Sequence, residues 1–155
     1  MLTTTVKENV SGRKSRAGTK PAGGGGLWPP GTDPLRMVRL VQAGFPYARL
    51  VRFQKVTSLP WETIAQWVQI PMRTLTRRRS EGRLRADESD RLLRAATVFG
   101  KAVDLFEGDV GAARRWLQTP QHGLAGELPL ELASTEVGAR QVEYLIARLE
   151  HGVFT

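Results

Sequence analysis

A segment rich in arginine and threonine extends from Pro71 to Arg79 of this chain of 155 residues. A guanidinium group can donate two parallel hydrogen bonds to O6 and N7 of guanine, and threonine or methionine side chains can contact other base edges or phosphates. Arg73 and Arg77 are therefore the best candidates for reading bases. The side chains that we predict to contact DNA are Met72, Arg73, Thr74, Thr76, Arg77 and Arg78.

The alternative interpretation of this segment is an ordinary solvated basic helix face. The residues around it favour DNA binding. Eight basic residues lie between Arg73 and Arg94, and the residues upstream have the spacing of a turn between two helices. Because these independent features agree, we prefer base reading, although the preferred base sequence does not follow from them.

No group of residues in the sequence has a recognisable catalytic or metal-binding pattern. The chain has no cysteine, which excludes disulfides, thiolate nucleophiles and cysteine-ligated zinc. His122 and His151 are isolated and lack the HExxH spacing, and the glycine run 23–26 lacks the lysine and hydroxyl residue of a phosphate-binding loop. We therefore expect a protein that is not an enzyme and that holds no metal and no cofactor.

Residues 60–79 have the pattern of a helix-turn-helix, in which two helices touch at a small residue and the second is polar on its outer side. Ala65 is the small residue, Ile70 is the apolar residue that fixes the turn, and Leu75 faces inward from the second helix. Pro60 and Pro71 are favourable first residues for the two helices. The pattern predicts a recognition helix from Pro71 to about Arg79.

Helical periodicity continues along the chain, and no segment alternates as a strand would. Shorter helices are expected over 35–42, 47–56, around 112–117 and from 129, a long one from about 87 to 107, and a last one between the cap Thr135 and Gly152. The fold class is thus all-α. It comprises a Cro/repressor-like helix-turn-helix domain over 34–85 and a small helical domain over 86–155. Residues 1–33 are expected to form a disordered basic arm, since glycine and basic residues dominate them.

The charge of the chain is divided unevenly between its two halves. The net charge is +8, yet residues 35–58 carry five basic and no acidic side chains, whereas residues 101–155 carry five basic and eight acidic ones. A basic half suits nucleic acid, and an acidic half suits a different partner. Two partners are therefore expected.

Six segments of the sequence together form a specific pattern: 70–78 (IPMRTLTRR), 82–84 (GRL), 88–94 (ESDRLLR), 112–120 (AARRWLQTP), 124–132 (LAGELPLEL) and 135–152, which begins T-x-x-G-A. With these segments the sequence closely resembles antitoxins of the Xre/MbcA/ParS group, which pair with RES-domain toxins in bacteria. The resemblance covers about residue 36 to the end. Two positions depart from the pattern: Ala125 stands where glycine is usual, and Arg85 stands where a small helix-capping residue is expected.

The resemblance implies that the first domain binds the promoter of the toxin-antitoxin operon and that the second binds the toxin. Toxins of this kind typically degrade NAD, and the C-terminal end of the antitoxin would cover the entrance to the active site. The residues so implicated in toxin binding are Glu150, His151, Gly152, Val153 and Phe154.

We expect from these observations a cytoplasmic type II antitoxin that occludes a RES-domain toxin and represses its own operon. Its expected partners are that toxin and operator DNA, with no membrane. A second copy of the chain is also expected, because recognition helices usually act in pairs. Two alternatives stay open: a stand-alone regulator whose C-terminal domain dimerises, and an RNA-binding or architectural protein that relies on basic charge. Trp116 could contact the toxin, but a core position is favoured.

Overall fold

The computed structural model describes residues 31–152, and its elements are all helices. Within this part of the chain the extended structure is limited to one isolated bridge between Pro46 and Arg83, which confirms the all-α prediction. The predicted arm, 1–33, lies almost entirely outside the described residues. In chain order the elements are α1 (Pro34–Ala43), α2 (Tyr47–Thr57), α3 (Trp61–Val68), α4 (Met72–Glu81), α5 (Ala86–Leu105), α6 (Val110–Leu117), the 3-10 helix η1 (His122–Leu124), α7 (Pro129–Leu132) and α8 (Glu136–Glu150).

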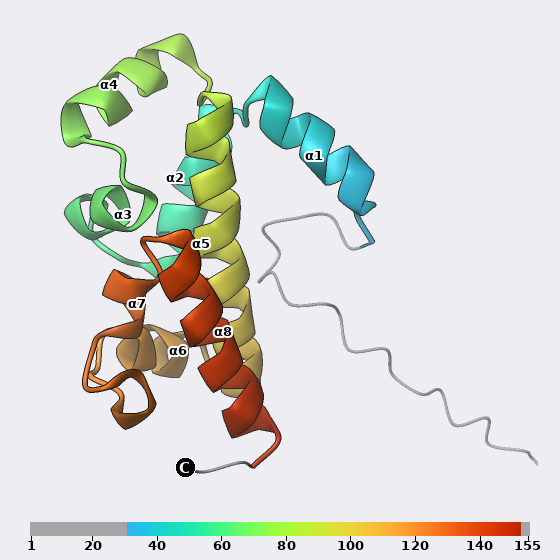
Figure 1. Ribbon diagram of the computed structural model, residues 1–155. Helices are drawn as coiled ribbons and strands as arrows, with labels where there is room; N and C mark the ends of the chain where they lie inside the picture. Colours follow the sequence, from blue (N-terminus) through green and yellow to red (C-terminus); the bar gives the residue numbers. More distant parts are fainter. Residues whose placement is uncertain (1–30, 153–155) are drawn as a thin grey trace, which may run out of the picture.

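The long helix α5 is the axis of the molecule (Figure 1). Its 20 residues span about 30 Å. Helices α2, α3 and α4 lie around its N-terminal half, from which α1 projects outward, and α6, α7 and α8 lie around its C-terminal half (Figure 1). One cluster of buried apolar side chains runs through both halves, from Phe45 to Ile146. The predicted domain boundary at 85–86 coincides with the start of α5 and stays a prediction.

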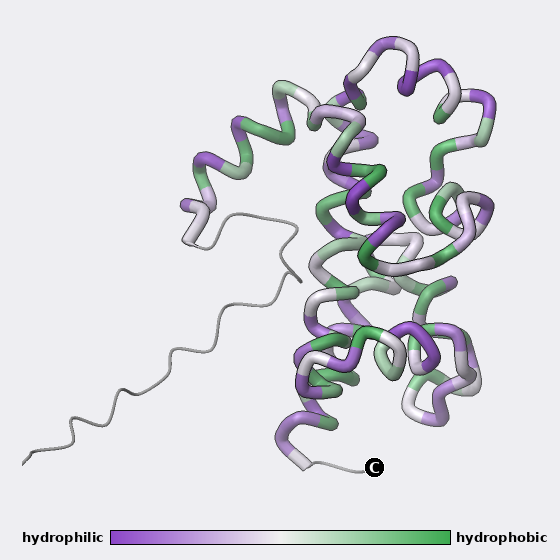
Figure 2. The backbone as a smooth tube through the Cα atoms, turned by 180° about the vertical axis from the view of Figure 1, so that it is seen from behind, coloured by the Kyte–Doolittle hydropathy of each residue, from purple (hydrophilic) through white to green (hydrophobic). Residues whose placement is uncertain are grey.

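Apolar periodicity explains which faces of the long helices are buried. Leu92, Ala96, Phe99 and Val103 of α5 are all buried, as the spacing predicts. Figure 2 shows hydrophobic and hydrophilic residues alternating along most helices, whereas α4 is largely hydrophilic. The only buried residues of α4 are Leu75 and Arg78, so most of its surface faces solvent.

Helix α5 ends at Leu105, two residues before the predicted end at about Glu107. Glu107 adopts the left-handed conformation with φ 54°, and the Gly108 N–H donates to the Val103 carbonyl oxygen at 2.9 Å. This is the hydrogen-bond pattern of a Schellman motif, in which the left-handed residue follows the helix. Glycine usually occupies that left-handed position, and the glycine here is one residue further along at Gly108, which explains why the sequence predicted a later end.

The loop between α1 and α2 pairs with the loop between α4 and α5. The Leu84 N–H donates to the Phe45 carbonyl and the Tyr47 N–H donates to the Gly82 carbonyl, each at 2.9 Å. Gly44 has φ 83°, and a Cβ atom there would collide with the Leu84 carbonyl oxygen. Glycine is therefore required where the end of α1 passes the loop that follows the recognition helix.

Candidate functional site

Helices α3 and α4 form the predicted helix-turn-helix. The turn begins at Gln69, which adopts φ 53°, and the Ile70 N–H donates to the Ala65 carbonyl at 3.0 Å. Ala65 is 7% exposed, Ile70 1% and Leu75 3%. The roles predicted for these three residues, at the helix contact, in the turn and on the inner face of α4, are confirmed.

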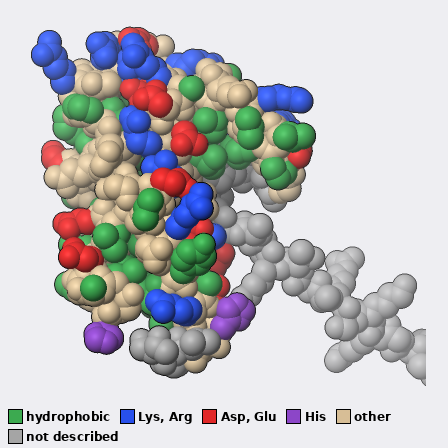
Figure 3. Space-filling view, viewed as in Figure 1, with side chains coloured by type: hydrophobic (Ala, Val, Ile, Leu, Met, Phe, Trp, Pro, Cys, Tyr) green, Lys and Arg blue, Asp and Glu red, His purple; other side chains and the backbone are tan. Residues whose placement is uncertain are grey.

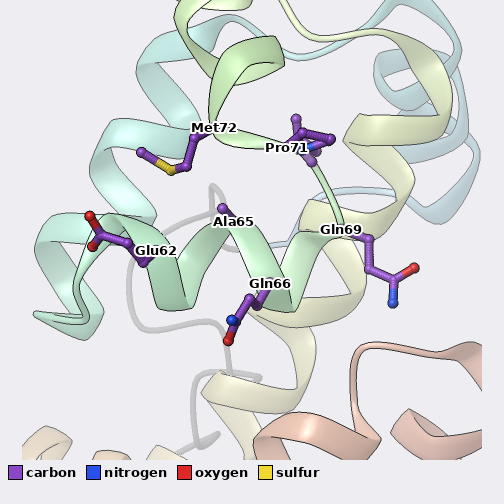
Figure 4. A pocket seen from close by; sticks show the side chains of 7 residues that line it. Glu62, Ala65, Gln66, Gln69, Pro71 and Met72 are labelled. Carbon is purple, nitrogen blue, oxygen red and sulfur yellow. The ribbon is translucent and has the colours of Figure 1, made fainter.

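A shallow hollow lies between α3 and the start of α4 (Figure 4). Ala65 is directed from α3 toward the start of α4, with Glu62 and Gln69 on either side of it, whereas the Gln66 side chain points away from α4 (Figure 4). A larger side chain at position 65 would enter the space between the two helices. The small residue thus sets how closely the recognition helix approaches α3.

The exposed face of α4 carries the two arginines with the strongest claim to read bases. Arg73, Thr76, Arg77 and Ser80 are exposed and recur at i, i+3, i+4 and i+7, so they share one side of the helix. Leu75 lies on the opposite side, against the core. Ser80 is absent from the predicted contacts, although its spacing from Arg73 could have revealed it.

The other predicted contacts differ in their exposure. Met72, the first residue of α4, is 44% exposed. Thr74 is less exposed, because it lies half-buried at the edge of the exposed face. The Thr76 hydroxyl donates to the Met72 carbonyl at 3.1 Å, which leaves its lone pairs available to a donor. These three residues stay predictions as DNA contacts.

The structure corrects the placement of Arg78, which was predicted to face DNA. Its side chain is 2% exposed, and its Nε donates to Glu88 Oε2 at 2.7 Å. A second donor, NH2, contacts Glu88 Oε1 at 2.9 Å, and NH1 contacts Glu81 at 3.0 Å. The sequence alone does not distinguish a buried arginine from an exposed one within this basic run. The distinction requires the position of Glu88, the carboxylate ten residues further along the chain. We therefore leave Arg78 out of the DNA-contacting set.

Basic side chains gather along the upper edge of the molecule, over α4 and the start of α5 (Figure 3). Arg79, Arg83 and Arg85 are exposed there in addition to Arg73 and Arg77. Arg83 also caps the end of α1, since its NH1 donates to the Gly44 carbonyl at 2.5 Å. A positive surface of this extent attracts the phosphate backbone.

The start of α5 lacks the usual small capping residue, as the sequence indicates at Arg85. An arginine side chain has no acceptor with which to cap a helix. Glu88 compensates, because its Oε2 accepts from the Arg85 main-chain N–H at 2.9 Å. Helix α5 accordingly begins at Ala86, within the predicted range.

An exposed stripe runs along α8 in the C-terminal half. Its members recur at intervals of four and three residues and so share one face of the helix. Val137 is 72% exposed and Tyr144 is 60% exposed, which is unusual for large apolar or aromatic side chains. The stripe, which we call the α8 stripe, comprises Val137, Gln141, Tyr144, Arg148 and His151.

Of the residues predicted to bind a toxin, those that the structure describes lie at the end of this stripe. Glu150 and His151 are exposed, and Gly152 follows with φ 68°. Val153 and Phe154 lie outside the described residues. Val137 and Tyr144, which share a helix face with His151, are not among the predicted contacts, although their spacing in the sequence could have shown that they lie on this face.

The structure explains why two residues of the T-x-x-G-A segment, Thr135 and Gly138, are of these types. The Thr135 hydroxyl accepts from the Gly138 N–H at 3.0 Å and caps α8, and a Cβ at Gly138 would collide with the carbonyl oxygen of Leu132.

Ala125, where glycine is usual, adopts φ 55°. A left-handed alanine is strained by about 1 kcal/mol.

Trp116 packs rather than projecting freely. Its ring centroid lies 6.4 Å from that of Phe106, and the adjacent Leu117 is fully buried. Trp116 itself is only partly buried and packs against the edge of the core, so the core position favoured from the sequence holds only in part.

Two family models match successive parts of the chain, and the gap between them lies within α5. Residues 36–96 match the antitoxin Xre-like helix-turn-helix domain, and residues 101–152 match the antitoxin Xre/MbcA/ParS C-terminal toxin-binding domain. Antitoxin Xre of Yersinia enterocolitica is 42% identical over 120 residues, which cover 77% of this chain and 81% of the relative. The chain belongs to the Xre antitoxin family. It is therefore an antitoxin with a helix-turn-helix domain and a toxin-binding domain.

Further relatives carry the same name. Antitoxin Xre of Photorhabdus laumondii is 36% identical over 115 residues, 74% of this chain and 78% of the relative. Antitoxin Xre of Pseudomonas putida is 38% identical over 84 residues, 54% of this chain and 52% of the relative. Membership of an antitoxin family confirms the prediction that the chain is not an enzyme.

Two structural observations bear on other partners. Among residues 31–152, no three His, Cys, Asp or Glu side chains are grouped so that they could hold a metal ion. No helix in the described part of the antitoxin is long and apolar enough to cross a membrane. The cytoplasmic location stays a prediction.

Proposed function

We propose that this antitoxin binds and occludes a RES-domain toxin that degrades NAD, and that it represses its own operon by binding operator DNA. The observation that carries the proposal is the separation of two exposed surfaces along α5. The face of α4 lies beside the N-terminal end of α5, and the end of α8 lies beside its C-terminal end (Figure 1). DNA and toxin could then occupy the chain at the same time.

The proposed DNA-binding surface is the exposed face of α4 with the surrounding arginines. Arg73 and Arg77 lie one helical turn apart and both side chains are exposed, as base reading in the major groove requires. Met72, Thr74, Thr76 and Ser80 would contact base edges or phosphates beside them.

Replacing both arginines tests this surface. R73A/R77A should weaken binding to the DNA upstream of the chain's own operon by about 1 to 3 kcal/mol per lost base contact, with a smaller loss on a scrambled duplex. The control R115A/R140A removes two exposed positive charges from the other half of the chain. Equal losses on both duplexes would favour charge-only binding.

The proposed toxin-binding surface is the α8 stripe together with Glu150, Gly152, Val153 and Phe154. Exposed apolar area rimmed by polar groups is typical of protein interfaces. The chain end would extend this surface to the entrance through which NAD reaches the toxin.

Deleting residues 150–155 tests the toxin-binding part. The shortened chain should still bind operator DNA but should allow the toxin encoded by the neighbouring gene to hydrolyse NAD. Unaltered inhibition by the shortened chain would contradict it. A locus with no neighbouring toxin gene would instead favour the stand-alone regulator.

We also propose that the chain acts as a homodimer within a larger toxin-antitoxin complex. Two recognition helices on repeated half-sites give the affinity that a single helix lacks. Light scattering on the purified antitoxin should give twice the mass of one chain, and a monomer that binds one half-site would contradict the dimer.

A further inference from the structure

Two side chains hold the recognition helix against the rest of the protein. Leu75 and Arg78 are the only buried residues of α4. The contact of Leu75 is apolar and therefore non-directional, so by itself it allows α4 to rotate about its own axis. The contact of Arg78 is different, because hydrogen bonds between a planar guanidinium and a carboxylate fix an orientation.

The carboxylate that receives Arg78 belongs to the first turn of α5. Nε and NH2 of Arg78 bond to the two oxygens of Glu88 at 2.7 and 2.9 Å. Oε2 of Glu88 also accepts from the Arg85 main-chain N–H, so the carboxylate itself is fixed to the start of α5. The side chains of Arg78 and Glu88 are 2% and 6% exposed, and water has little access to replace these bonds.

The same stretch of α5 holds the other elements of the helix-turn-helix domain. Ser89 Oγ accepts from the Phe45 N–H at 2.8 Å, in the loop between α1 and α2. Arg91 Nε donates to the Val68 carbonyl at 2.8 Å, at the end of α3. The bond between Arg78 and Glu88 thus places α4 relative to the helix that also places α3 and the α1–α2 loop.

We propose that Arg78 and Glu88 are positioning residues that set the rotation of α4 and so determine base selectivity without touching DNA. This inference rests on the proposed DNA binding by α4. A rotation of about 15° would move a guanidinium about 9 Å from the helix axis by about 2 Å, beyond the tolerance of a bidentate contact. Phosphate contacts tolerate such a shift, because flexible arginines reach the backbone over a range of positions.

The test compares selectivity with salt dependence in R78K, E88Q and the double variant. R78K keeps the charge but loses the planar fork, and E88Q keeps the size and one acceptor but loses the second. Each chain is titrated with the DNA upstream of its own operon and with a scrambled duplex, over a series of salt concentrations. The titrations are done at a temperature at which circular dichroism shows every variant folded. The control R115K makes the same change at an exposed arginine of α6, outside the proposed DNA-binding surface.

If Arg78 and Glu88 position α4, the ratio of the affinity for the operon DNA to the affinity for the scrambled duplex should fall about tenfold in R78K and in E88Q. The dependence of affinity on salt concentration should stay that of the wild type. The double variant should lose no more than the worse single variant, because the two residues act as one unit. R115K should keep the ratio within about twofold.

An unchanged ratio in folded R78K and E88Q would overturn the proposal. A second result would also overturn it: equal losses of affinity on both duplexes, together with a slope of log affinity against log salt concentration that is smaller by about one. That result indicates a phosphate contact by Arg78. If R78K does not fold, E88Q decides alone, since glutamine can still accept from the Arg85 N–H. A wild-type chain without operator preference would overturn the proposed DNA binding itself, and the positioning role with it.

Discussion

Arg91 in α5 donates from Nε to the main-chain carbonyl oxygen of Val68 at 2.8 Å, at the C-terminal end of α3. Its NH2 also approaches the carbonyl of Gln69 at 3.5 Å. The last carbonyl groups of a helix have no partner within the helix, so a guanidinium is a suitable cap. The long helix therefore stabilises the turn that leads into the recognition helix.

Replacing Arg91 by methionine should remove this cap while keeping the aliphatic part of the side chain. We expect the free energy of unfolding to fall by about 1.5 to 3 kcal/mol, the usual contribution of a hydrogen bond that involves a charged group. Urea denaturation measures the change. The control R140M breaks an exposed ion pair with Glu136, and it should change stability by less than about 0.5 kcal/mol. Equal effects of the two substitutions would argue against a special role of the cap.

Replacing Ala125 by glycine should stabilise the antitoxin by about 1 kcal/mol, because the left-handed backbone at this position disfavours a Cβ. Ala125 is exposed, so no packing is lost. The matched control A147G makes the same chemical change inside α8, where it should destabilise by about 1 kcal/mol. Thermal denaturation should therefore shift in opposite directions, and a loss of stability in A125G would refute the strain.

Stability should depend on the protonation of Glu88. Burial alone would raise the pKa of this carboxyl, but hydrogen bonds from Arg78 and from the Arg85 N–H outweigh burial and lower it below its ordinary value. A lowered carboxyl pKa adds stability above the ordinary pKa of 4.5, and this stability is lost as the pH falls through the lowered pKa. The wild type should thus exceed E88Q in stability at neutral pH, with the difference shrinking in acid.

Denaturant unfolding of both chains from about pH 7 to about pH 3 measures this difference. A gap between wild type and E88Q that stayed constant over the whole range would show that Glu88 does not titrate in the way described.

The α8 stripe should be required for toxin neutralisation and dispensable for folding. Y144A and V137A remove exposed side chains, so each should change the free energy of unfolding by less than about 0.5 kcal/mol. Affinity for the toxin should fall about tenfold or more if either residue is a central contact. The control E131A alters an exposed residue of α7 outside the stripe. Wild-type affinity in both stripe variants, measured by calorimetry, would move the interface elsewhere.

Much of the fold follows from the sequence because apolar periodicity and helix-terminal residues determine the helices directly. Pro34, Pro71 and Thr135 each mark a helix start within one residue of the observed one. The buried stripe of α5 and the turn residues Ala65 and Ile70 follow from the same kind of evidence. The 3-10 helix η1 escapes prediction because three residues carry no periodicity.

The site was less predictable, since exposure depends on contacts that are distant in sequence. Arg77 and Arg78 are adjacent and chemically identical, yet one is exposed and the other is buried against Glu88. A helical projection of α4 places Arg78 near Leu75 on the inner face. Only the position of α5 shows that the carboxylate of Glu88 lies within hydrogen-bonding distance of it. The α8 stripe differs from Arg78 in this respect, because the spacing of Val137 and Tyr144 on one helix face could have been seen in the sequence.

NAD consumption by the toxin encoded beside this gene, measured against increasing amounts of the full-length antitoxin, tests the proposed function most directly. We predict that NAD hydrolysis falls to background once the toxin is saturated, and that the chain without residues 150–155 leaves hydrolysis at the rate of the toxin alone. Undiminished hydrolysis in the presence of excess full-length antitoxin would contradict the proposal.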